Sequence, residues 1–291
     1  MITTGEFCKK EYGEKLYKLS LSSGCTCPNR DGHIGYGGCI FCSEGGSGDF
    51  AESYAPLSEQ IENAKKRVSS KYKGDKYIAY FQSFTNTYGP LERLKDLYDE
   101  AAARDDIAVI SIATRPDCLP DDIINYLGEL NKVKPLWVEL GLQTVKEESI
   151  EYIRRGYETI VYDEAVKKLN DLGIHTITHV ILGLPGETKE DMLSTVKHTV
   201  EMGSKGIKLQ LLHVLEGTDL ADDYSKGLFK TLEMEEYIEI LADCLKILPK
   251  DMVVHRMTGD GPKKILIAPL WSGDKKRVMN AINKRIREEG L

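Results

Sequence analysis

The feature that most constrains the fold of this chain is a regular alternation of short apolar runs with longer amphipathic segments. The runs are bounded by turn residues and predict strands at residues 16–21, 77–81, 108–113, 137–142, 176–182 and 206–212. The amphipathic segments predict helices at residues 58–72, 90–103, 120–130, 147–155, 162–172, 189–201, 233–248 and 275–288. Because parallel strands need a crossover connection, this alternation favours a parallel sheet covered by helices.

The alternation alone is compatible with an open doubly wound sheet or with a barrel, full or partial. Both architectures bind ligands at the carboxyl ends of their strands. No repeat, low-complexity tract or Gly/Ser/Pro-rich linker interrupts the 291 residues, a length that one α/β domain can accommodate. We therefore predict one domain, with its core at residues 1–213 and a C-terminal extension at residues 214–291 packed on that core.

The composition is typical of a globular protein, with 41% hydrophobic and 29% charged residues. The N-terminal segment is polar and lacks the apolar stretch of a secretory signal, and no window approaches the roughly 18 apolar residues of a membrane span. We therefore expect a cytoplasmic protein without a membrane partner. A formal net charge of −7 argues against a nucleic-acid footprint over the whole surface and leaves a local basic face open.

Four of the seven cysteines, Cys25, Cys27, Cys39 and Cys42, fall close together in a glycine-rich segment after the first predicted strand. An odd number of cysteines in a reducing compartment argues against a disulfide framework and favours metal binding by the clustered four. Glycines permit tight turns, so such a segment can wrap around a compact inorganic group. The remaining cysteines, Cys8, Cys118 and Cys244, are interpreted as incidental thiols.

Two metal sites fit these cysteines. All four thiolates can close a tetrahedral zinc site. Alternatively, three of them, Cys27, Cys39 and Cys42, can hold a [4Fe–4S] cluster and leave one iron open to a further ligand. Structural zinc usually stabilises small modules without a core, whereas this segment belongs to a domain large enough to form one. The cluster is therefore the favoured interpretation, with Cys25 set aside.

The pair Cys39 and Cys42, with Phe41 between them and Cys27-Pro28 upstream, resembles the radical S-adenosylmethionine (radical SAM) signature. Eleven residues separate Cys27 from Cys39, more than in the commonest form of that signature, and a similarly stretched gap occurs in the radical SAM domain of the elongator catalytic subunit. The chain is most similar to the YhcC-like radical SAM proteins over nearly its whole length. The segments that carry this resemblance are CPNRDGHIGYGGCIFC, AYFQSFTNTY, ATRPDCLP, VELGLQT, HVILGLPGET and LLHVLEGT.

The resemblance implies a partial (β/α)6 TIM-type barrel with a C-terminal α/β extension. It implies a [4Fe–4S] cluster on the three cysteines and S-adenosylmethionine as cofactors. Reductive cleavage of S-adenosylmethionine would give a 5′-deoxyadenosyl radical that abstracts hydrogen from an unidentified substrate. A flavodoxin or a ferredoxin is the expected electron donor.

The resemblance also assigns contacts with S-adenosylmethionine at the ends of the predicted strands. The turn after the second strand lacks the usual Gly-Gly-Glu-like motif, so its polar residues are expected to meet the cofactor's amino group. Gln143 and Arg155 have the spacing found in oxygen-independent coproporphyrinogen oxidase and are expected at the ribose and the carboxylate. An apolar contact with adenine is expected from the fifth strand. The predicted cofactor-binding residues are Gln82, Ser83, Thr85, Gln143, Arg155 and Leu182.

Other polar residues near the strand ends are candidates for lining a substrate site. Glu139 lies inside an apolar strand, so we expect it to be paired within the barrel with Arg115 or Lys208. A short apolar run ending in Arg256 is expected to cover part of the lateral opening of the barrel. The predicted substrate-lining residues are Arg115, His179, Lys208, Gln210, His213 and Arg256.

The substrate is expected to be a small molecule or an RNA. Its identity does not follow from the sequence, and two alternatives stay open. The resemblance to the elongator subunit and a run of basic residues over 275–287 suggest an RNA-modifying radical SAM enzyme, although a solvated helix face is the default explanation of such a run. An alternative of another class is a zinc-stabilised binding protein without catalytic activity.

Overall fold

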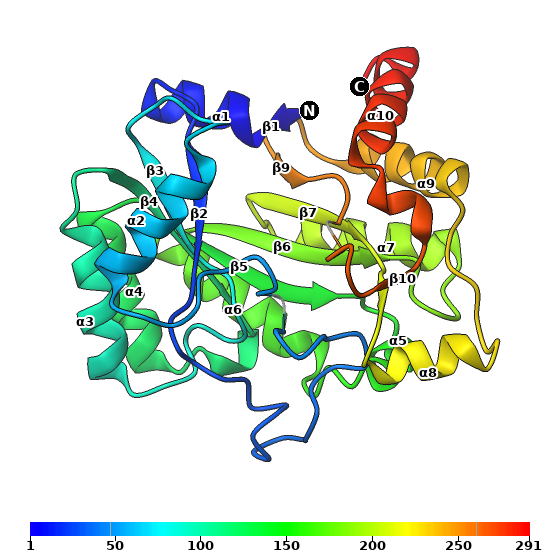
Figure 1. Ribbon diagram of the computed structural model, residues 1–291, viewed down its shortest axis with the longest axis horizontal. Helices are drawn as coiled ribbons and strands as arrows, with labels where there is room; N and C mark the ends of the chain where they lie inside the picture. The colour runs from blue at the N-terminus through cyan, green and yellow to red at the C-terminus, as the bar shows by residue number, and fades with distance from the viewer. Residues whose placement is uncertain (47, 260) are drawn as a thin grey trace.

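A computed structural model describes residues 1–46, 48–259 and 261–291. Within these residues, eight parallel strands form one curved sheet in the spatial order β1-β9-β7-β6-β5-β4-β3-β2 (Figure 1). The sheet is an open half-barrel, which confirms the predicted α/β partial barrel. Its strands are β1 (Ile2–Thr3), β2 (Tyr17–Leu21), β3 (Tyr77–Phe81), β4 (Ile107–Thr114), β5 (Leu136–Gln143), β6 (His175–Leu182), β7 (Gly206–Leu211) and β9 (Val253–Arg256).

Helices follow the strands and cover the outer face of the half-barrel (Figure 1). Within the described ranges, no helix combines the length with the apolar character that crossing a bilayer requires. The helices are α1 (Thr4–Tyr12), α2 (Leu57–Val68), α3 (Leu91–Ala102), α4 (Asp121–Val133), α5 (Glu147–Tyr152), α6 (Thr159–Asp171), α7 (Lys189–Glu201), α8 (Asp219–Ser225), α9 (Met234–Ile247) and α10 (Lys275–Glu289), with 3-10 turns at Pro116–Cys118 and Leu270–Gly273.

The sheet has two strands in addition to the six that the alternation predicts, and one of them is the expected short run that ends in Arg256. β9, from the C-terminal segment, pairs in parallel with β7, and β1 pairs in parallel with β9. The run that ends in Arg256 thus joins the sheet itself. Both strands are too short for a two-residue periodicity to stand out from the background. A second, antiparallel pair joins β8 (Val214–Leu215) to β10 (Leu266–Ala268). Because β9 comes from the C-terminal segment and pairs within the same sheet, the two segments are joined in one sheet. The predicted domain boundary near residue 213 therefore stays a prediction.

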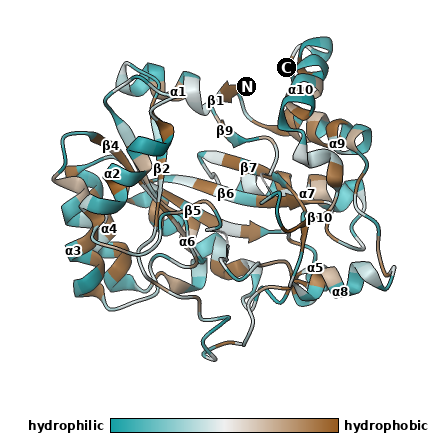
Figure 2. Ribbon diagram, viewed as in Figure 1, coloured by the Kyte–Doolittle hydropathy of each residue, from teal (hydrophilic) through white to brown (hydrophobic). Residues whose placement is uncertain are grey.

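Strand β5 shows how the sequence sorts its side chains between the two faces of the sheet. Leu136, Val138, Leu140 and Leu142 belong to the outer core beneath α2, α3, α4 and α6. Their alternating neighbours point into the half-barrel, because successive side chains in a strand face opposite sides. In Figure 2, brown segments are frequent in the strands, and the outer helices carry both teal and brown segments.

Helix α1 packs at the amino-terminal end of the half-barrel, at the top of Figure 1. Cys8 on this helix packs with Tyr80 and Trp137 in an inner apolar cluster. The rings of Phe7 and Trp137 lie 6.0 Å apart between centroids. A capping box between Thr3 and Glu6 starts the helix directly after β1. The space lined by the inner-face side chains is therefore filled at this end and accessible at the carboxyl ends of the strands.

Candidate functional site

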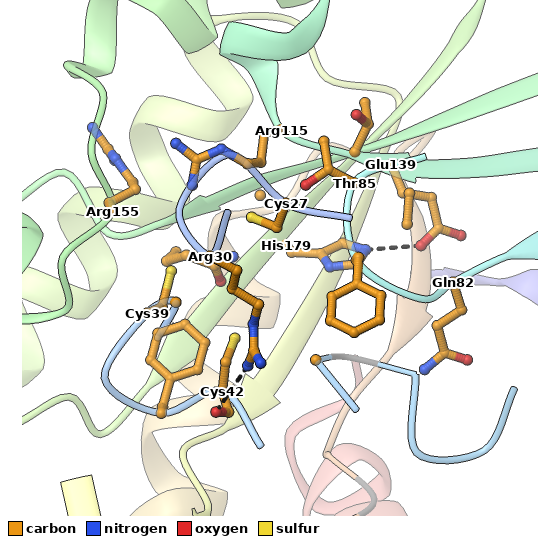
Figure 3. A pocket seen from close by; sticks show the side chains of 18 of the residues that line it. Cys27, Arg30, Cys39, Cys42, Gln82, Thr85, Arg115, Glu139, Arg155 and His179 are labelled. Atoms are coloured by element: carbon orange, nitrogen blue, oxygen red, sulfur yellow. Dashed lines mark hydrogen bonds and ion pairs between the residues drawn. The ribbon is translucent and has the colours of Figure 1, made fainter. Parts of the chain in front are cut away.

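The loop that leaves β2 carries the cysteine cluster over the carboxyl edge of the sheet. Arg30 joins the two halves of this loop, since its Nη2 donates to the Cys42 carbonyl at 3.2 Å and its Nη1 donates to the Glu44 carbonyl at 3.3 Å. Asn29 Nδ2 donates to the Arg154 carbonyl at 2.6 Å and so attaches the loop to the segment after α5. Cys27, Cys39 and Cys42 line one cavity as a result (Figure 3).

The thiols of this cavity have an environment suited to ligation. Hydrogen bonding from Cys42, together with the nearby Arg115 and Asn29, lowers the pKa of Cys39 to about 7 although burial opposes the shift. The same hydrogen bond raises the pKa of Cys42, its donor. Thiolates are the ligating form of cysteine. In the part of the chain that the structure describes, no three His, Cys, Asp or Glu side chains are grouped around a single metal-ion position.

Cys25 lies apart from the other three cysteines. Its side chain is buried in the outer core, and its Sγ accepts a hydrogen bond from Arg93 Nη2 at 2.9 Å. The cavity is not lined by Cys25. The loop therefore presents three cysteines to the cavity and directs the fourth into the protein.

Gln143, at the end of β5, has an unusual backbone and an unsatisfied side chain. Its φ is +68°, and the pairing with β6 shifts register between Gly141 and Gln143. The conformation is strained for a residue with a side chain. Gln143 Oε1 is buried without a hydrogen-bond partner within the described residues, and the side chain lines the cavity. A buried acceptor left without a donor is costly, so this amide is suited to a ligand hydroxyl or N–H group.

Arg155 borders the same cavity, but its guanidinium is used by the protein itself. Nη1 donates to the carbonyls of Leu142 at 2.9 Å and Thr144 at 2.8 Å. Nε and Nη2 donate to the Tyr157 carbonyl at 3.0 and 2.9 Å, and Nη2 also donates to Thr159 Oγ1 at 3.1 Å. These bonds engage all five guanidinium donors. The geometry thus makes Arg155 a brace for the loop after β5 and does not leave it a donor for the expected carboxylate contact.

Arg115 is the neighbouring guanidinium of the cavity. It forms a bidentate pair with Asp117 through Nε and Nη2, at 2.9 and 2.8 Å, and its Cζ lies 4.9 Å from the centre of the Tyr157 ring. Asp117 is therefore its ionic partner, and the expected pairing of Arg115 with Glu139 is absent from the contacts of these described residues. Figure 3 shows Arg115 and Arg155 on one side of the cysteines.

The other predicted cofactor contacts divide between the two faces of the sheet. Gln82 and Thr85 line the cavity, whereas Ser83 is buried beneath the loop beside Gly48. Leu182 is fully buried in the outer core against α7 and α9. The expected adenine contact by the Leu182 side chain is therefore wrong, because the alternation of β6 turns Ile181 inward in its place.

A layer of buried charge forms the floor of the cavity. Glu139 accepts from Lys18 Nζ at 2.9 Å and Ser111 Oγ at 2.8 Å through Oε1, and from His179 Nε2 at 2.8 Å through Oε2. Lys208 Nζ donates to the same Oε2, which confirms the expected pairing within the barrel. Although burial raises the pKa of Glu139, these cations hold it well below its usual range. Burial lowers the pKa of His179 to about 4, so its imidazole is neutral at pH 7.

A second cavity adjoins the first along the inner faces of β6, β7 and β9. The two cavities share wall residues that include Gln82, Gln143 and His179. Five of the predicted substrate-lining residues line the second cavity, and the sixth, Arg115, lines the first; the five are His179, Lys208, Gln210, His213 and Arg256. The structure therefore brings these residues to one end of the half-barrel.

Several residues of the site were not predicted from the sequence. Lys18 was detectable by the argument applied to Glu139, since it is a charged residue within an apolar strand. Tyr80 accepts from Lys208 Nζ at 3.0 Å, and the Tyr157 hydroxyl donates to the Gly141 carbonyl. Tyrosine in a strand and tyrosine after a turn are too common to signal these roles. Arg30 also gave no sequence signal, because its partners are backbone carbonyls.

The residues present fit an iron–sulfur cluster with an organic cofactor beside it. Three cysteines on a glycine-rich loop can provide thiolate ligands, and the fourth cysteine is directed away. Beside them, Gln82 and Gln143 line the cavity, and the buried Oε1 of Gln143 has no hydrogen-bond partner within the described residues. This arrangement lies at the carboxyl end of a parallel half-barrel, where such folds bind their ligands.

Comparisons with known sequences agree with this geometry. A family model described as "Radical SAM superfamily" matches residues 24–199, and one described as "Radical_SAM C-terminal domain" matches residues 204–288. An uncharacterized protein YtqA of Bacillus subtilis is 46% identical over 283 residues, covering 97% of this chain and 88% of that protein. Protein YhcC of Escherichia coli is 32% identical over 283 residues, covering 97% of this chain and 91% of that protein.

Solved structures share the fold at lower identity. An archaeal Methanocaldococcus infernus Elp3 with an N-terminal deletion gives a TM-score of 0.70 at 19% identity, covering 100% of this chain and 64% of that one. Coproporphyrinogen III oxidase (HemN) from Escherichia coli, a radical SAM enzyme, gives a TM-score of 0.55 at 16% identity, covering 84% of this chain and 55% of that one. The family match spans more than half of the sequence, and two relatives exceed 30% identity over almost all of it. The chain therefore belongs to the radical SAM superfamily, among its YhcC- and YtqA-like members.

Proposed function

We propose that this protein is a radical SAM enzyme with a [4Fe–4S] cluster on Cys27, Cys39 and Cys42. The observation that carries the proposal is the meeting of these three cysteines with the unsatisfied Gln143 Oε1 in one cavity at the carboxyl edge of the half-barrel. When bound, the cluster and S-adenosylmethionine supply a reductive cleavage that yields a 5′-deoxyadenosyl radical able to remove hydrogen from a substrate.

The chain's own residues bind and orient in this proposal. Gln143 would accept a hydrogen bond from the ribose, and the carboxamide of Gln82 with Thr85 would meet the amino group of S-adenosylmethionine. Arg115 would take the role expected of Arg155 towards the carboxylate, because all five donors of Arg155 are engaged by the protein. A one-electron donor such as a flavodoxin or a ferredoxin completes the system.

Anaerobic reconstitution with iron and sulfide tests the cluster. The wild type should become brown and hold about four irons per chain, whereas Cys39→Ala should lose most of the colour and the iron. The matched control is Cys25→Ala, which removes a cysteine outside the cavity and should keep the iron content of the wild type. Far-ultraviolet circular dichroism verifies that both variants are folded.

The competing zinc site predicts the opposite pattern. A colourless protein that binds one zinc ion and loses it in Cys25→Ala would overturn the cluster and favour a zinc-stabilised protein without catalytic activity. Reduction of the iron-loaded protein with S-adenosylmethionine should release 5′-deoxyadenosine. Absence of this product with every reductant tried would refute the radical chemistry even if the cluster is present.

An RNA-modifying activity is the second candidate, favoured by the functions of more distant relatives. A tRNA uridine(34) acetyltransferase of Methanocaldococcus jannaschii is 28% identical over 180 residues, which cover 61% of this chain and 32% of that protein. The basic helix α10 offers limited support, because Arg285 Nη2 lies 2.7 Å from Glu289 and Lys284 Nζ lies 3.7 Å from Glu288. Stimulation of 5′-deoxyadenosine release by tRNA, with transfer of deuterium from labelled tRNA into that product, would establish this candidate.

A further inference from the structure

The second cavity contains a row of nitrogen-bearing side chains on neighbouring strands. His179 on β6 is paired in register with Lys208 on β7, and Lys208 is paired with Arg256 on β9. Residues directly opposite in a parallel sheet point to the same face. All three side chains line this cavity, so the row lies across the inner face of the half-barrel, beside the cavity that holds the three cysteines.

The acidic residues around this row balance only part of its positive charge. Glu139 already faces both Lys18 and Lys208 through its two oxygens. Asp49, a carboxylate that also lines the cavity, accepts from Ser43 Oγ at 3.0 Å and forms no ion pair with Arg256 or Lys208 within the described residues. Among residues 1–46, 48–259 and 261–291, Arg256 forms neither a hydrogen bond nor an ion pair, although its side chain is half-buried. One buried carboxylate therefore serves two ammonium groups, and a guanidinium beside them has no partner.

The electrostatic setting of Lys208 points in the same direction. Burial lowers the pKa of Lys208, and the nearby Lys18 and Arg256 lower it further despite the pull of Glu139. An anion in the cavity would relieve this repulsion. A guanidinium also binds carboxylate and phosphate groups through two parallel hydrogen bonds, which gives orientation as well as affinity.

We propose that the second cavity binds an oxyanion of the substrate, a carboxylate or a phosphate group, with Arg256 as its principal contact and Lys208 beside it. The inference rests on the proposed function, because it names the class of molecule that the radical would attack. His179 borders both cavities, so a substrate anchored at Arg256 would extend past this imidazole towards the cofactor cavity. The Gln210 amide, in the same wall, offers both a donor and an acceptor to the rest of the substrate.

Equilibrium dialysis of the iron-loaded protein with radiolabelled inorganic phosphate and, separately, radiolabelled glutarate tests the inference. The wild type should bind one of these probes at one site per chain, which also identifies the preferred oxyanion. Arg256→Gln should weaken that binding at least tenfold. Arg256→Lys keeps the positive charge but loses the two parallel N–H donors of the guanidinium, so it should weaken the binding less than Arg256→Gln does. Arg277→Gln, a change on the exposed face of α10, is the matched control and should bind as the wild type does.

Two results would overturn the inference. One is the absence of binding of either probe to the wild type, a measurement that does not depend on the folding of any variant. The other is equal binding by wild type, Arg256→Gln and Arg256→Lys. Iron content and 5′-deoxyadenosine release by the wild type test the proposed function separately. Loss of anion binding alone would reject the substrate class, and loss of radical chemistry alone would reject the proposed function.

Discussion

Replacing Glu139 with glutamine removes the one carboxylate that both Lys18 and Lys208 contact in the floor of the cavity. The substitution keeps the shape of the side chain and removes its charge. Lys208 has 3% of its side-chain surface exposed, whereas Lys18 has 25% and can reach water. The energetic consequence therefore falls mainly on Lys208. We expect Glu139→Gln to lower the free energy of unfolding by about 3 kcal/mol at pH 7, as for other broken buried pairs.

The size of this effect has an upper limit set by the protonation of Lys208. Without Glu139, Lys208 is expected to fold as the neutral amine, since burial and nearby cations already lower its pKa. Neutralising a lysine with an ordinary pKa of about 10.4 at pH 7 costs about 4.6 kcal/mol at most. The Tyr80 hydroxyl, 3.0 Å from Nζ, still offers the neutral amine a hydrogen bond.

The pH dependence of urea unfolding, followed by far-ultraviolet circular dichroism, separates this explanation from simple loss of packing. In the variant, the unfolded chain binds a proton at Lys208 that the folded chain lacks. Stability should therefore rise between pH 7 and pH 10, by up to about 1.4 kcal/mol per pH unit relative to the wild type. Glu100→Gln, on the exposed face of α3, is the control and should change stability by less than about 0.5 kcal/mol.

A loss smaller than about 1 kcal/mol for Glu139→Gln, with a wild-type pH profile, would refute the reasoning. It would mean that Lys208 is already neutral in the native protein. The charged floor would then be a hydrogen-bonded network instead of an ion pair.

Three further predictions concern other parts of the site. Burial lowers the pKa of His175 from 6.5 to about 4, so the wild type should lose stability as the pH falls through that range. The His175→Asn variant should lose less stability over the same range, as measured by urea unfolding. Gln143→Gly should relieve the backbone strain at φ +68° and so raise the melting temperature. The same change should weaken binding of S-adenosylmethionine about tenfold in calorimetry. An unchanged affinity would show that this amide does not contact the cofactor. Arg155→Lys should lower the free energy of unfolding in urea by about 3 kcal/mol, because buried carbonyls lose their donors. The control is Arg154→Lys, a change at a half-exposed side chain. Equal stability of the two variants would contradict the structural role of Arg155.

The inner and outer faces of β5 could be assigned from the sequence because apolar residues alternate with Trp137, Glu139 and Gly141. In β6 the same rule was available, but Ile181 and Leu182 are both apolar. Composition therefore could not decide which of them faces the cavity, and the outer position of Leu182 depends on the register with β5 and β7.

The role of Arg155 was beyond sequence reasoning for a different reason. Its spacing from Gln143 placed it correctly at the border of the cavity. Whether a guanidinium faces a ligand or the backbone depends on which carbonyls are left without donors nearby. Here the chain bulges at the end of β5, and Arg155 donates to the Thr144 carbonyl and to the Leu142 carbonyl, which also accepts from the Thr144 amide. That demand arises from backbone geometry and has no residue signature.

The unclosed half-barrel has a consequence for self-association. An open sheet exposes unpaired backbone groups at both edges, and long edges of this kind serve as templates for pairing between chains. At one edge β1 offers only two residues before the chain turns into α1. At the other edge, the Glu52 amide donates to the Ser20 carbonyl at 3.0 Å, and the Gln60 side chain bonds both backbone groups of Ser22. The lateral opening can thus stay wide enough to admit a ligand without inviting aggregation through its edges.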